Sequence, residues 1–152
     1  MDDRYVVIGV GNPLRGDDGV GLRVAAELVG RLDTGVELTT SDGDPGELMD
    51  MWRDAACAVV VDAMLSGRDA GTVEVFDVTN ASLPACLTLE STHRAGTASA
   101  VELARALDRL PACLFIVGVE GTVFDLGEEL SDDVAASVDD AVTAIEKILA
   151  HA

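Results

Sequence analysis

The sequence predicts an α/β protein, a three-layer α/β/α sandwich around a five-stranded, largely parallel, twisted sheet. Short β-branched runs alternate along the chain with segments whose apolar residues recur at helical spacing, which is typical of strands connected through helices. The first and third runs are almost entirely apolar, as expected for parallel strands covered on both faces. We expect right-handed connections and one domain over residues 1–152, without a repeat or linker.

Five runs rich in Val, Ile, Leu or Thr are the expected strands. The second and fourth alternate between apolar and polar residues, and the third ends in a carboxylate, Asp62. The strands are expected at residues 4–10, 36–40, 57–62, 72–76 and 113–119.

Capping residues mark the first two expected helices. The first follows a glycine-rich loop and ends at Gly35, with Val20, Val24 and Leu28 on one face. The second begins after Asp44, since an N-cap aspartate precedes a proline and an acidic residue at the third helical position.

Two later helices are expected after a long irregular stretch at about residues 77–95. Ser99 and Glu102 have the spacing of a capping box and predict a helix that runs to about residue 110. Ser131 precedes two aspartates and caps the last helix, whose acidic first turn suits the positive helix end. That helix has one apolar face, formed by Val134, Val138, Ala141, Ile145 and Ile148.

Composition narrows the function. The formal charge of −18 disfavours nucleic acid and anionic membranes, and it fits either a solvated acidic surface or the steering of a cation or basic partner. No apolar run approaches the roughly 18 residues of a membrane span. We expect a soluble, cytoplasmic protein without membrane insertion or a secretory signal, and three reduced thiols. Cys57 and Cys113 lie in apolar runs typical of inert core thiols, and nothing local activates Cys86.

The glycine-rich loop after the first strand, residues 9–19 (GVGNPLRGDDG), is not a phosphate site. Leu14 stands where a dinucleotide fingerprint needs its third glycine, so the close helix approach is not expected. A P-loop alignment places Asp17 and Asp18 where a lysine and a hydroxyl residue are required, and two carboxylates repel a phosphate. The loop therefore favours a cation or a purely structural turn.

Ligands of such sheets collect at the carboxyl ends of the strands, where Asp18, Asp62 and His93 are expected to meet. Their nitrogen and oxygen ligands suit a divalent transition metal such as zinc, nickel, manganese or iron. Each residue also has a structural alternative. Asp17 or Asp18 could cap the next helix, Asn12 and Asp62 could bond turn backbone, and His93 could be a hydrogen-bonded loop residue.

Three segments are informative together: residues 9–21 (GVGNPLRGDDGVG), residues 61–63 (VDA) and the pair Thr92 and His93. They resemble the corresponding segments of the hydrogenase maturation endopeptidases. Asp42 and Gly43, and residues 117–119, also resemble family segments. The resemblance spans about residues 6–119, and its glycine–asparagine–acidic motif is the specific part. After the fifth strand this chain has Glu120 and Gly121 in place of a frequent Gln-Pro pair. Asp44 replaces a small residue, which predicts a more acidic rim.

The resemblance implies an α/β/α endopeptidase that removes a C-terminal extension from the large subunit of a nickel–iron hydrogenase after nickel insertion. By position, Asp18, Asp62 and His93 become the catalytic and metal-interacting residues. We expect no resident cofactor, because the nickel is presented by the immature large subunit, and we expect a bound water to attack the peptide bond. Without a GxSxG elbow or cysteine dyad, no acyl-enzyme is expected. The alternatives are a non-catalytic chaperone for the nickel-loaded subunit, a resident-metal hydrolase and a nucleotide-binding enzyme.

Overall fold

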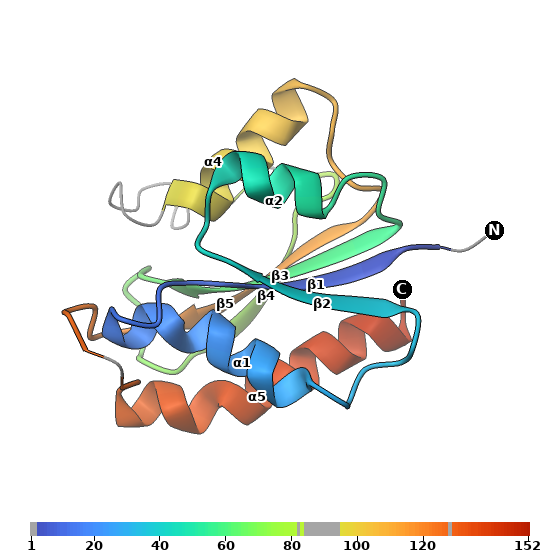
Figure 1. The fold of residues 1–152 in the computed structure, drawn as a ribbon. Helices are drawn as coiled ribbons and strands as arrows, with labels where there is room; N and C mark the ends of the chain where they lie inside the picture. Colours follow the sequence, from blue (N-terminus) through green and yellow to red (C-terminus); the bar gives the residue numbers. More distant parts are fainter. Residues whose placement is uncertain (1–2, 82, 84–94, 128) are drawn as a thin grey trace.

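Five strands form one sheet in the computed structural model, which describes residues 3–81, 83, 95–127 and 129–152 (Figure 1). The spatial order is β2-β1-β3-β5-β4. All pairs are parallel except β4 with β5, which is antiparallel and places β4 at one edge. The strands are β1 (Tyr5–Val10), β2 (Val36–Ser41), β3 (Cys57–Met64), β4 (Val73–Asp77) and β5 (Leu114–Glu120).

Helices cover both faces of this sheet, which confirms the predicted three layers. The helices α1 (Val20–Leu28) and α5 (Asp132–Ala150) lie together on one face, and α2 (Pro45–Met51) and α4 (Ala95–Ala106) lie on the other (Figure 1). A short 3-10 helix, η1 (Gly16–Gly19), precedes α1. In the described part of the chain, no helix combines the length and the apolar character needed to cross a bilayer.

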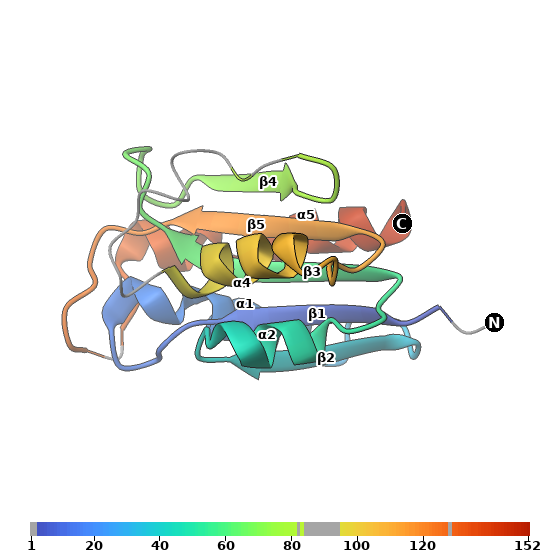
Figure 2. The same ribbon diagram turned by 90° about the horizontal axis from the view of Figure 1, so that it is seen from above.

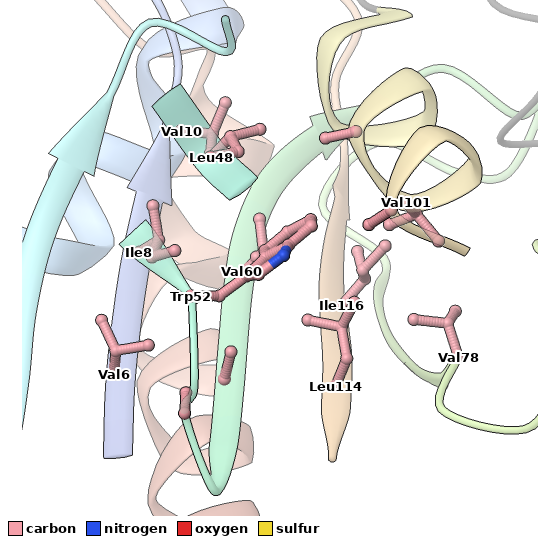
Figure 3. Close-up of a cluster of buried hydrophobic side chains, with 14 of the residues drawn as sticks. Val6, Ile8, Val10, Leu48, Trp52, Val60, Val78, Val101, Leu114 and Ile116 are labelled. Atoms are coloured by element: carbon pink, nitrogen blue, oxygen red, sulfur yellow. The ribbon is translucent and has the colours of Figure 1, made fainter. Parts of the chain in front are cut away.

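Two aliphatic cores, one on each face, hold the layers together. The core under α2 and α4 includes Ile8, Val60 and Ile116 from the sheet and surrounds Trp52, the single tryptophan (Figure 3). The core under α1 and α5 is built largely from valines of the strands and helices. Strand residues therefore alternate between two buried faces, which explains why the central strands are continuous apolar runs.

The helix α1 ends at Leu28, so the expectation that it continues to Gly35 is wrong. Val29 has an extended ψ of 125°, and Gly30 has a φ of +80°, a left-handed conformation that favours glycine and ends the helix. The start of α2 is as predicted. Asp44 is its N-cap and accepts a hydrogen bond from the backbone N–H of Glu47 (2.9 Å).

The helix α4 begins at Ala95, four residues before the predicted capping box, so that prediction is wrong. Ser99 and Glu102 lie inside the helix. Contacts from other segments determine the start, because the backbone of Gly96 packs so closely on the backbone of Gly43 that no Cβ would fit. The helix ends at Ala106 rather than near residue 110.

The strand β3 continues to Met64, two residues beyond its predicted end. Ala63 and Met64 pair with Val119 and Glu120 of β5, so Asp62 lies within the strand, opposite Gly118. The other strand boundaries agree with the prediction to within one residue.

Candidate active site

A small cavity of about 40 Å³ lies at the carboxyl ends of the parallel strands. Three carboxylate residues from different segments line it: Asp18 in η1, Asp42 directly after β2, and Asp62 in β3. The remaining lining residues are small or apolar: Val10, Gly11, Gly43, Gly96 and Thr97. The structure therefore brings Asp18 and Asp62 to one edge, whereas His93 and Cys86 lie outside the described residues.

Asp18 is half-buried, and its side chain bonds to the loop that precedes it. Its Oδ2 accepts a hydrogen bond from the backbone N–H of Asn12 (3.0 Å). The suggestion that it caps α1 is wrong, because the N-cap of α1 is Gly19 and no side chain caps that helix. The suggestion for Asn12 is confirmed, since its Oδ1 accepts from the backbone N–H of Leu14 (2.9 Å).

Asp17 has a structural role that the sequence did not indicate. It is fully buried, and its carboxylate accepts hydrogen bonds from the backbone N–H groups of Thr122 (2.9 Å), Val123 (2.9 Å) and Ser131 (2.7 Å), and from the Ser131 hydroxyl. Burial alone would raise the pKa of Asp17, but these donors together hold the pKa below its ordinary value. Asp17 thereby fastens the glycine loop to the loop after β5 and to the start of α5.

Asp62 is half-buried within β3, and α4 positions its carboxylate. The hydroxyl of Thr97, in the first turn of α4, donates a hydrogen bond of 2.8 Å to its Oδ2. Asp62 therefore does not begin a turn, as its place at the predicted strand end had suggested. The first turn of α4 also reaches the cavity through Gly96 and Thr97.

Asp42 is a candidate that the sequence analysis missed. It appeared there only as part of a resemblance, with Gly43, yet it lines the same cavity. Its Oδ1 accepts a hydrogen bond from the backbone N–H of Asp44 (3.2 Å). The rule that polar residues after parallel strands gather at one edge would have found it. Asp44, in contrast, does not line this cavity and caps α2. The more acidic rim expected from Asp44 stays a prediction.

The cavity is an oxygen-rich, negatively charged environment. Within the described ranges, neither Asp18 nor Asp42 forms an ion pair with a basic side chain. The described part of the chain contains no group of three His, Cys, Asp or Glu side chains close enough to hold a metal ion by themselves. The described arrangement can thus offer carboxylate oxygens to a cation or to a water molecule, without a complete ligand set of its own.

The glycines of the loop bring α1 against the sheet. Gly21, inside α1, lies so close to the carbonyl oxygens of Val10 and Val61 that a Cβ would overlap both, and Gly9 is equally close to Gly21. The expectation that this chain lacks a close helix approach is therefore wrong. Gly21, rather than a glycine at position 14, allows the close packing of α1 against β1 and β3.

One further carboxylate near the strand ends is structural. Glu120 is buried, and its carboxylate accepts hydrogen bonds from the backbone N–H and the hydroxyl of Ser66. It ties the segment after β3 to the end of β5 rather than facing a substrate.

Cys57 lies at the other end of the sheet. Burial, together with the neighbouring Cys113, raises the pKa of its thiol to about 12, which confirms an inert core thiol.

The comparisons with known proteins agree with this geometry. Residues 23–148 match the model of a family described as hydrogenase maturation protease. The chain belongs to this family. It is a peptidase with a role in hydrogenase maturation. The matched segment includes Asp62, and it begins after the glycine loop that contains Asp18.

Solved structures and curated relatives support membership of the hydrogenase maturation proteases. The hydrogenase maturating endopeptidase HybD from E. coli superposes with a TM-score of 0.81 at 26% identity, covering 97% of this chain and 93% of that one. The maturation protease HybD from Thermococcus kodakarensis gives 0.71 at 28% identity, covering 95% and 98%. The hydrogenase expression/formation protein HupM of Azotobacter chroococcum mcd 1 is 29% identical over 96% of this chain and 71% of its own length.

Proposed function

We propose that this protease removes the C-terminal extension of a nickel–iron hydrogenase large subunit after nickel insertion, and that Asp18, Asp62 and His93 recognise the nickel carried by that substrate. The observation that carries the proposal is the cavity at the strand ends, where Asp18 and Asp62 from separate elements line one space. Carboxylates that converge at one edge of a sheet are suited to a cation supplied from outside. His93 completes the proposed set by its place in the sequence motif.

In this proposal the metal belongs to the substrate and licenses cleavage. A precursor without nickel offers the carboxylates no cation, so its scissile bond is bound less well than that of the loaded precursor. A water held beside a carboxylate loses a proton to it while its oxygen attacks the peptide carbonyl, and the departing amine takes up a proton. Asp42 is an additional exposed carboxylate that lines the same cavity, and its Oδ2 is available to hold either the cation or the water.

Thr97 has a positioning role in this scheme. Its hydroxyl fixes one oxygen of Asp62, and Thr97 itself is 6% exposed, so the contact is protected from solvent. Thr97→Val keeps the shape and removes the donor. We expect a roughly tenfold lower kcat and a melting temperature only about 3–6 °C lower, since one hydrogen bond to a charged group contributes about 1.5 kcal/mol. Thr97→Ser should restore activity, and a Thr97→Val enzyme with wild-type kcat would remove this role.

The decisive experiment is processing of purified precursor, loaded with nickel or free of nickel, by wild type and by Asp18→Asn, Asp62→Asn and His93→Gln. Asp33→Asn is the matched control, because it makes the same chemical change on an exposed residue in the loop between α1 and β2. We expect the three site variants to lose cleavage while remaining folded and the control to keep it. Wild-type cleavage by all three would refute the site assignment. Equal cleavage of nickel-free precursor would refute nickel recognition.

A further inference from the structure

A set of exposed aliphatic side chains lies on the two loops that Asp17 joins. It consists of Leu14, Val123 and Leu126, whose side chains are 54%, 45% and 86% exposed. Leu14 is on the loop after β1, and the other two are on the loop after β5. Both loops lie at the same end of the sheet (Figure 2). We refer to these three residues as the apolar rim.

Backbone hydrogen bonds hold the apolar rim in one arrangement. Gly16 N–H donates to the carbonyl oxygen of Gly127 (2.8 Å), Gly127 N–H donates to that of Leu14 (2.9 Å), and Asp17 N–H donates to that of Val123 (2.7 Å). The buried carboxylate of Asp17 adds its bonds to the same loop. Exposed aliphatic side chains on a fixed frame are typical of a surface that another molecule covers, because little conformational entropy is lost when it docks.

Charge around the apolar rim selects the kind of partner. Residues 121–133 contain five acidic residues and no basic one, and Arg15 is the single basic residue of the glycine loop. Among the described members, Asp125 and Glu129 are exposed. A partner that fits therefore presents aliphatic side chains bordered by Lys or Arg.

The loops that carry the apolar rim are also tied to the candidate site. Asp17 links it to Thr122 and Val123, and the next residue, Asp18, lines the cavity. We propose that the apolar rim docks the folded part of the protein substrate, through an aliphatic patch bordered by basic residues, and so delivers the scissile segment to the cavity. This inference rests on the proposed function, since it assigns the substrate of that same site.

The test compares two double variants in cleavage of nickel-loaded hydrogenase large-subunit precursor. The first is Leu14→Ser with Leu126→Ser. The control is Val29→Ser with Leu107→Ser, which removes similarly exposed aliphatic side chains at the ends of α1 and α4. We expect KM to rise at least about tenfold in the first variant with kcat preserved, and to stay unchanged in the control. Leu126→Met should retain the wild-type KM, and added salt should raise KM.

The outcomes separate the two proposals. If wild type cleaves the precursor and the rim variant has the same kcat/KM, the docking surface is refuted and the proposed function stands. If wild type cleaves no precursor, both fail. Light scattering tests whether a second copy of the chain covers the rim. A wild-type dimer that the rim variant loses, with cleavage unchanged, would contradict our proposal. A KM insensitive to salt would refute the basic border of the partner.

Discussion

The buried carboxylate of Asp17 offers a sharp test of how this protein holds its candidate site together. The substitution Asp17→Asn keeps the size of the side chain and removes its charge. One carboxylate oxygen accepts from Thr122 and Val123, and the other accepts from Ser131. The asparagine amide has a single acceptor oxygen, so its NH₂ group must face backbone N–H donors on one of the two sides.

The magnitude follows from these contacts. A hydrogen bond to a charged group contributes about 1.5–3 kcal/mol, and a buried donor left without an acceptor costs a further amount of similar size. We therefore expect the free energy of unfolding to fall by about 3–5 kcal/mol in Asp17→Asn. For a domain of this length, that loss lowers the Tm by roughly 10–15 °C.

The same bonds predict a pH dependence. The pKa of Asp17 is lowered in the folded state from an ordinary value of 3.8. The carboxylate therefore contributes its full stability above about pH 5, and this contribution is lost as the pH falls below about 4 toward the folded pKa. The stability difference between wild type and Asp17→Asn should be largest near neutral pH and should narrow below pH 4.

Urea unfolding followed by tryptophan fluorescence measures these quantities, since Trp52 is the single tryptophan and is fully buried. Asp125→Asn is the matched control, because it removes the same charge from an exposed side chain. We expect the control to lie within about 0.5 kcal/mol of wild type. If Asp17→Asn and the control unfold at the same urea concentration, the carboxylate does not hold the two loops together.

Other parts of the fold give further predictions. Gly21→Ala should lower the free energy of unfolding by about 2–3 kcal/mol by overpacking α1 against the sheet, whereas Gly35→Ala, where a Cβ meets nothing within 4 Å, should not change the urea midpoint. Glu37→Gln removes an exposed ion pair with the arginine before β1 and should cost less than about 1 kcal/mol in the same assay; a larger loss would contradict solvent screening. Cys57 should resist iodoacetamide in the native protein, since on the order of one thiol in 10,000 is ionised at pH 8. Peptide mapping that finds it alkylated as fast as the half-exposed Cys113 would contradict this.

The strands were predictable because burial on both faces requires apolar residues at consecutive positions of the sequence. A central parallel strand is apolar at consecutive positions, so its boundaries fall within one or two residues of the apolar run. The start of α4 was not predictable in this way. Ser99 and Glu102 satisfy a local capping rule, but the packing of Gly96 on Gly43 and the bond from Thr97 to Asp62 place the first turn earlier. Contacts between distant segments prevail over a local preference worth about 1 kcal/mol.

The candidate site also contains residues that the sequence predicts and residues that it does not. The convergence of Asp18 and Asp62 follows from a general property of parallel sheets, and the same property should have included Asp42. The role of Asp17 could not be inferred, because its partners lie 105 to 114 residues further along the chain. Sequence spacing shows which carboxylates reach an edge, but only the packed loops show which of two neighbours points inward.

The opposite environments of Asp17 and Asp18 follow from η1. Successive residues of a 3-10 helix are about 120° apart around its axis, so one aspartate is buried in the fold while the next lines the cavity. Among the described residues, backbone N–H groups and a serine hydroxyl hold Asp17, and no arginine or lysine does. A basic side chain in that position would place a full positive charge close to Asp18 and compete with any incoming cation. By using neutral donors, the fold stabilises its structural carboxylate and leaves the negative charge of its neighbour available.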